Sequence, residues 1–219
     1  MKQREVFLEG EGDAWLARNQ AALAARSLPA DDPLLTEILL LPLVGAAHPV
    51  RLLEIGCGDG ARLEWLHHHR GFACSGLDPS RLAVTRAAAR GVDARHGTAD
   101  RLPFADNAFD IVVFGFCLYL CDRDELFRIA AEADRVLSPP GWLVIHDFHS
   151  PVPRARTYHH VAGLMSYKMD FSRLFSWHPD YSIVAQKIID EGGGRPTEDE
   201  ERWLATSVLR KRGAGGARE

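Results

Sequence analysis

The sequence contains few cysteines and shows none of the spacings that mark a disulfide framework. Its four cysteines, Cys57, Cys74, Cys117 and Cys121, are scattered through 219 residues. Such isolated cysteines favour free thiols, as in a reducing compartment. No other metal-ligating side chains stand near them at a suitable spacing, so we expect no metal site.

Long apolar runs and an excess of basic charge are also absent. The most apolar stretch, residues 38–44, is interrupted by Pro42 and is too short to span a bilayer. Residues 1–5 are not followed by the apolar segment of a secretory signal. With 26 Lys and Arg against 30 Asp and Glu, the net charge is -4, which gives nucleic acid no general attraction. We expect a cytoplasmic monomer or homodimer that binds neither membranes nor nucleic acid.

Apolar strand-like segments alternate with helical segments through the middle of the chain. Strands are predicted over 50–55, 72–77, 92–96, 109–116 and 142–145, with helices between most of them. This alternation predicts a parallel sheet with helices on both faces. Ligands bind such sheets beyond the carboxyl ends of the strands.

The segments on either side of this core follow other patterns. Residues 1–48 predict a helical cap, with helices over 11–25 and 33–41, the second capped by Asp32 ahead of Pro33 and ending near Pro42 and Gly45. Residues 150–180 are rich in aromatic and histidine side chains and predict a substrate lid. Strands over 181–189 and 203–209 predict an antiparallel pair at one edge of the sheet. The glycine-rich tail, 213–219, is expected to be disordered.

A glycine-rich turn follows the first predicted strand and precedes a helix. Gly56, Gly58 and Gly60 alternate there, which lets a ligand approach the backbone and the helix N-terminus closely. Asp78 ends the next strand at the spacing of a ribose-binding acid. These residues alone predict a nucleotide-like cofactor and leave NAD open.

Several motifs together resemble the class I S-adenosylmethionine (SAM) methyltransferases, in the methyltransferase-11 or UbiE-like group. The resemblance covers residues 50–147. It is carried by Glu54-x-Gly56-x-Gly58-x-Gly60 and by the segments 76–80, 97–104, 109–112 and 136–143. It implies a Rossmann-like sheet of seven mostly parallel strands with an antiparallel C-terminal hairpin, within a methyltransferase domain over 49–212.

The same resemblance implies the cofactor site. The backbone of the glycine turn would face the methionine part of SAM, Asp78 the ribose hydroxyls, and Asp100 with the Ala99 backbone the adenine amino group. Phe116 would lie beside the methionine part. The complete set expected to bind SAM, or its product S-adenosylhomocysteine (SAH), is Glu54, Gly56, Cys57, Gly58, Gly60, Asp78, Pro79, Ala99, Asp100, Arg101 and Phe116.

The expected activity is methyl transfer from SAM to an O or N atom of a small molecule, such as a sugar or a natural-product intermediate. A base is required only where the acceptor must lose a proton. The residues expected to serve in catalysis are His159, His160, Tyr119 and His149. Two alternatives are an NAD-dependent oxidoreductase and a non-catalytic binding subunit with a methyltransferase-like fold.

Overall fold

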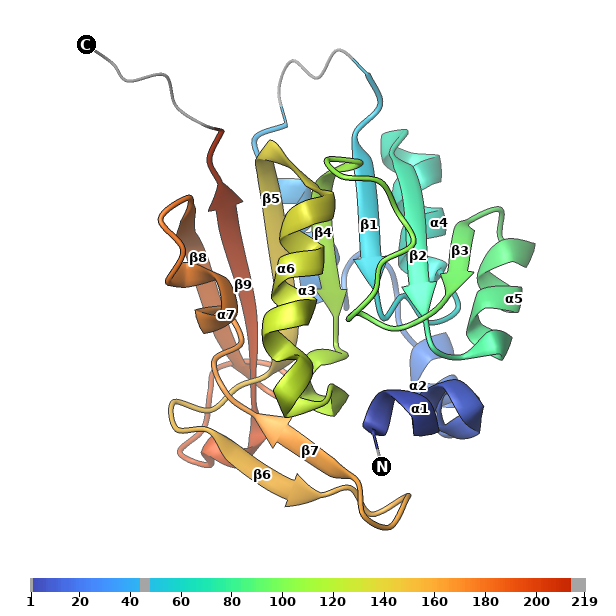
Figure 1. The fold of residues 1–219 in the computed structure, drawn as a ribbon, viewed down its shortest axis with the longest axis vertical. Helices are drawn as coiled ribbons and strands as arrows, with labels where there is room; N and C mark the ends of the chain where they lie inside the picture. The colour runs from blue at the N-terminus through green and yellow to red at the C-terminus, as the bar shows by residue number, and fades with distance from the viewer. Residues whose placement is uncertain (1, 44–47, 214–219) are drawn as a thin grey trace.

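The computed structural model describes residues 2–43 and 48–213, and its centre is a seven-stranded sheet (Figure 1). The strand order is β3-β2-β1-β4-β5-β9-β8. Neighbours among β1 to β5 run parallel, whereas β9 pairs antiparallel with both β5 and β8. The predicted fold class is confirmed. The strands are β1 (Arg51–Ile55), β2 (Ala73–Asp78), β3 (Asp93–His96), β4 (Phe109–Gly115), β5 (Leu137–Phe148), β8 (Tyr181–Asp190) and β9 (Trp203–Lys211).

Helices cover both faces of the sheet because successive strand residues point to opposite sides. Leu53 and Val112 belong to the core beneath α6 and α7, while Leu52 and Ile111 belong to the core beneath α3 and α4. Figure 1 shows α6 in front of the sheet and α3 and α4 behind it. The helices are α1 (Gln3–Val6), α2 (Gly12–Ala24), α3 (Pro33–Leu40), α4 (Ala61–Arg70), α5 (Arg81–Ala89), α6 (Leu126–Val136) and α7 (Arg173–Ser176).

Two helix starts follow the local signals in the sequence. The Leu35 N–H donates to Oδ1 of Asp32 over 2.9 Å at the start of α3. The Ala83 N–H donates to Oγ of Ser80 over 2.9 Å at the start of α5. In both cases the side-chain oxygen satisfies a backbone donor that has no partner within the helix.

Other segments differ from the prediction. Strand β5 already begins at Leu137, five residues before the predicted strand at 142–145, because Leu137 pairs with Phe109 of β4. The lid segment contains a second, two-stranded sheet of β6 (Arg154–Thr157) and β7 (Met165–Lys168), which the sequence analysis did not predict. Most residues of β6 are exposed, so the strand carries no apolar alternation that could reveal it.

The N-terminal segment crosses the end of the sheet at which β1, β2 and β4 finish (Figure 1). A π-helical turn, Phe7–Glu11, joins α1 to α2. Asp13 of α2 accepts hydrogen bonds from Oγ of Ser80 over 2.5 Å and from the Leu82 N–H over 3.0 Å. These bonds hold α2 against the start of α5.

The division into a cap over 1–48 and a domain over 49–212 stays a prediction, as does the role of 150–180 as a lid. Gly45 and the predicted disordered residues 214–219 lie outside the described residues.

Candidate active site

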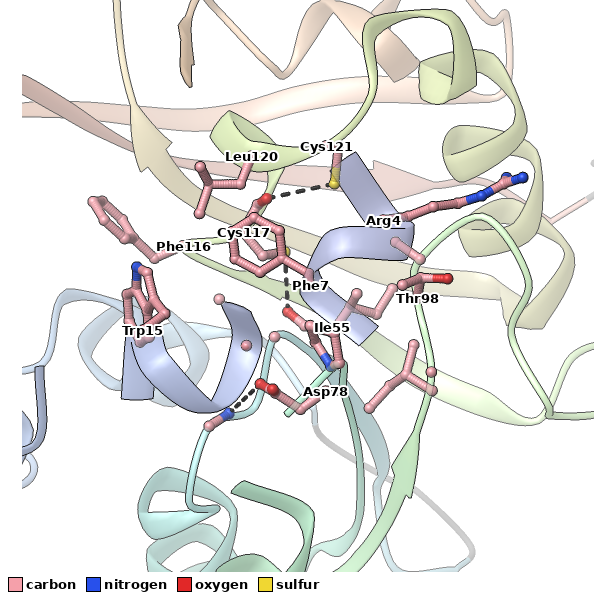
Figure 2. A pocket seen from close by; sticks show the side chains of 18 residues that line it. Arg4, Phe7, Trp15, Ile55, Asp78, Thr98, Phe116, Cys117, Leu120 and Cys121 are labelled. Carbon is pink, nitrogen blue, oxygen red and sulfur yellow. Dashed lines mark hydrogen bonds between the residues drawn. The ribbon is translucent and has the colours of Figure 1, made fainter. Parts of the chain in front are cut away.

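A cavity lies beyond the carboxyl ends of β1, β2 and β4, at the edge where ligands bind in parallel sheets. It contains about 770 Å³ of empty space, part of it open to solvent. Figure 2 shows the side chains around it. The lining residues are Arg4, Phe7, Gly12, Trp15, Ile55, Gly56, Gly58, Leu77, Asp78, Pro79, Gly97, Thr98, Ala99, Gly115, Phe116, Cys117, Leu120 and Cys121.

The predicted glycine turn forms one wall of the cavity. Gly56, Gly58 and Gly60 have φ values of 79°, 54° and 76°, in the region that favours glycine. Gly56 and Gly58 line the cavity, whereas Gly60 does not. A Cβ on Gly60 would stand 2.8 Å from the Cβ of Ala87, so this glycine allows α4 to approach α5. Cys57 is buried, and burial raises the pKa of its thiol well above the ordinary value.

Asp78 presents a carboxylate to the cavity (Figure 2). Its Oδ2 accepts the Gly58 N–H and its Oδ1 accepts the Ser80 N–H, each over 2.9 Å. Each oxygen keeps a lone pair for a further donor. Burial raises the pKa of Asp78 to about 6. The carboxylate is therefore oriented by the backbone and can accept two neighbouring hydroxyl groups.

Glu54 lies beside the cavity but is not among its lining residues. It is buried with Asp32, and Arg62 forms ion pairs with both carboxylates. Burial raises the pKa of Glu54 to about 7 although Arg62 opposes the shift. Its Oε2 has no hydrogen-bond partner in the part of the chain that the structure describes.

The other predicted cofactor residues divide between the lining and the rim. Pro79, Ala99 and Phe116 line the cavity. Phe116 has a φ of 60°, an uncommon value for a residue with a side chain, at the point where β4 ends. Asp100 is outside the lining and pairs with Arg4 over 2.8 Å. Arg101 is exposed and outside the lining.

None of the four predicted catalytic residues lines the cavity. Tyr119 lies behind two residues of the lining. The Tyr119 hydroxyl accepts the Trp15 Nε1–H over 2.9 Å, and the Tyr119 ring lies 5.1 Å from the ring of Phe116. His149 is buried elsewhere, stacked 6.3 Å from Trp203. The side chains of His159 and His160 are exposed.

Asp147 positions the turn that carries Tyr119. It is buried at the end of β5 and accepts the N–H groups of Leu118 and Tyr119 over 2.8 and 3.3 Å. Burial raises the pKa of Asp147 to about 7. The carboxylate thereby satisfies backbone donors at the start of a short 3-10 turn, Leu118–Leu120, beside Phe116.

The N-terminal segment contributes to the lining, although none of the predicted site residues belongs to it. Arg4, Phe7, Gly12 and Trp15 all face the cavity. A Cβ on Gly12 would stand 3.0 Å from the Ser80 nitrogen, so this glycine allows close contact with the turn after β2. The available signals were the glycines at positions 10 and 12 and an aromatic residue on either side of them.

The chain has similarity to known proteins in the region that forms the cavity. Residues 53–145 match the model of a family described as a methyltransferase domain. The chain contains a class I methyltransferase domain. The predicted family is confirmed over these residues, and SAM is the cofactor of that family.

Two curated relatives are similar to parts of this chain. Methyltransferase GfsG of Streptomyces halstedii is 35% identical over 113 residues, which cover 48% of this chain and 39% of that protein. A demethylmenaquinone methyltransferase of Renibacterium salmoninarum is 33% identical over 120 residues, which cover 52% of this chain and 47% of that protein. The matches thus span less than half of either relative.

A solved structure with the same fold extends over almost the whole chain. It is the 1,6-didemethyltoxoflavin-N1-methyltransferase of Burkholderia thailandensis, with bound 1,6-didemethyltoxoflavin and SAH. The TM-score is 0.69 at 16% identity, over 95% of this chain and 89% of that one.

Residues 2–43 and 48–213 contain neither a helix that could span a membrane nor a group of side chains that could hold a metal ion. No helix in these ranges is both long and apolar enough to cross a bilayer. No three His, Cys, Asp or Glu side chains in them are grouped so that they could hold a metal ion.

Proposed function

We propose that the methyltransferase domain transfers a methyl group from SAM to an O or N atom of a small molecule, such as a sugar or a natural-product intermediate. The observation that carries this proposal is the oriented carboxylate of Asp78 in a cavity bordered by Gly56 and Gly58. The Burkholderia structure, which holds 1,6-didemethyltoxoflavin and SAH, supports a small-molecule acceptor.

The residues around the cavity fit the chemical groups of SAM. Asp78 would accept the two ribose hydroxyls, because each of its oxygens has a free lone pair. Gly56 and Gly58 leave room for the methionine part, since neither carries a side chain that would fill the cavity. Ala99 and Asp100 would contact the adenine. Oε2 of Glu54 has no hydrogen-bond partner among the described residues, and the ammonium group of SAM is a donor that would fit it.

The chain's own contribution to the reaction would be alignment of the two reactants. SAM supplies a methyl group on a positively charged sulfur. The described lining includes no histidine, lysine or tyrosine side chain, and burial raises the pKa of its two thiols, Cys117 and Cys121. Asp78 also lines the cavity, but the ribose would occupy its carboxylate. We therefore propose that an unprotonated nitrogen can react without a base in the cavity, whereas a sugar hydroxyl would have to release its proton to water. Phe7, Trp15 and Phe116 would hold a planar acceptor in place.

Removal of the Asp78 carboxylate tests this proposal. The affinity of Asp78→Ala for SAH should fall about 100-fold or more, because two hydrogen bonds to a charged group are lost. Isothermal titration calorimetry measures the affinity, with NAD titrated in parallel and expected not to bind.

The matched control is Asp93→Ala, which removes an exposed carboxylate from the neighbouring strand β3. Its SAH affinity should equal that of the wild type. Unchanged SAH affinity in Asp78→Ala, or no SAH binding by the wild type, would contradict the proposed function.

A further inference from the structure

Helix α1 is fixed at the rim of the cavity by backbone hydrogen bonds. The N–H groups of Gln3 and Arg4 donate to the two carboxylate oxygens of Asp122 over 2.9 and 3.0 Å. The Gln3 side chain donates to the Leu120 carbonyl over 2.7 Å, and Leu120 lines the cavity. The position of the Arg4 backbone is therefore set without help from the Arg4 side chain.

The Arg4 side chain connects this helix to the predicted adenine-binding residue. Its Nη1 lies 2.8 Å from Oδ2 of Asp100 and 3.1 Å from Oε1 of Glu125. Figure 2 shows its guanidinium directed away from Asp78. Arg4 thus adds a carbon stem to the cavity wall and keeps its charge at the rim.

The ion pair leaves one oxygen of Asp100 available. Within the described residues, Oδ1 of Asp100 has no hydrogen-bond partner, whereas Oδ2 is held by Arg4. A carboxylate on a loop can rotate about its side-chain bonds, and an ion pair to one oxygen restricts that rotation. An ionised carboxylate accepts hydrogen bonds and cannot donate them.

We propose that Arg4 is a positioning residue for adenine recognition. By holding Oδ2 of Asp100, it presents Oδ1 to the adenine amino group, so that the site selects an amino group over a carbonyl oxygen. This inference rests on the proposed function, because it requires the adenosyl part of SAM to lie in the cavity. The N-terminal segment, outside the matched residues 53–145, would then determine the base specificity of the methyltransferase domain.

The test compares two ligands that differ at one position of the base. S-inosylhomocysteine carries an oxygen where SAH carries the amino group. Calorimetry gives the preference of each variant for SAH over this analogue. Arg4→Gln should reduce the preference at least fivefold, with most of the change in SAH affinity, since about 1 kcal/mol corresponds to fivefold. Arg4→Lys should recover part of the preference, because an ammonium group can still pair with Asp100.

Lys2 provides the matched control. It pairs with Asp124 and, over 3.4 Å, with Glu125, so it links the same segment to the same loop without contacting Asp100. Lys2→Gln should leave both affinities unchanged. If Arg4→Gln lost affinity for both ligands equally, Arg4 would only hold the helix. If Arg4→Gln bound SAH more tightly, the Arg4 side chain would compete with adenine. Either result overturns the inference while SAH binding by the wild type upholds the proposed function.

Discussion

At the scale of single residues, Asp78 should make cofactor binding depend on pH. Its pKa of about 6 means that the carboxylate gains a proton as the pH falls through this value. Ribose hydroxyls donate to the ionised form, so SAH affinity should fall about tenfold between pH 7 and pH 5. Calorimetry across this range measures the change.

Glu54 and Asp147, both with a pKa of about 7, also titrate near the site, so the pH dependence must be assigned to one carboxyl group. Asp78→Asn provides the assignment because an amide does not titrate. This variant should bind SAH more weakly at pH 7 and show an almost flat profile. If its profile keeps the wild-type slope, the dependence belongs to another group.

At the scale of elements, the contact between α2 and the turn after β2 depends on Gly12. Alanine is the better helix former by about 1 kcal/mol. However, a Cβ here would stand 2.9 Å from the Phe7 oxygen, 3.0 Å from the Ser80 nitrogen and 3.1 Å from the Pro79 carbonyl carbon. Gly12→Ala should therefore lower the free energy of unfolding by about 1–3 kcal/mol. SAH affinity should also fall, because Pro79 lines the cavity. Urea denaturation and calorimetry measure the two effects.

Gly213→Ala is the control for this substitution. The nearest atoms to a Cβ at Gly213 are 3.9 Å away, an ordinary contact distance. Its stability and SAH affinity should match those of the wild type. A more stable Gly12→Ala protein would mean that helix propensity outweighs the close contact.

At the scale of the whole molecule, Arg62 joins three elements behind the cavity. It pairs with Asp32 at the start of α3 and with Glu54 of β1, while Arg62 itself belongs to α4. Arg62→Met would leave both carboxylates buried without their cation, and should cost about 3–5 kcal/mol of unfolding free energy. Arg90→Gln removes exposed pairs with Asp59 and Glu64 and should cost less than about 1 kcal/mol.

The loss of unfolding free energy in Arg62→Met should also depend on pH. Glu54 already has a raised pKa, and without Arg62 its protonated form is favoured further. Because a neutral carboxyl group costs less to bury, the variant should lose less stability at pH 5 than at pH 8. Urea denaturation at both pH values measures this difference. An equal loss at both values would show that buried charge is not the cause.

Local patterns in the sequence predicted much of this architecture because they depend on neighbouring residues. Asp32 caps the helix that directly follows it, as predicted, and Ser80 caps the next but one in the same way. Asp122 directly precedes a short 3-10 turn, yet its side chain accepts the N–H groups of Gln3 and Arg4, more than 100 residues earlier. No periodicity encodes such a distant contact, and for this reason the N-terminal part of the cavity was missed.

The place of Lys2 has a practical consequence for producing the protein. Lys2 directly precedes α1 at the cavity rim, whereas Lys211 ends β9 at the opposite end of the sheet (Figure 1). An affinity tag or fusion partner attached before Lys2 would be tethered beside Arg4. One attached beyond Lys211 would start from the far end of the molecule. Ligand measurements should therefore use protein purified through a C-terminal tag.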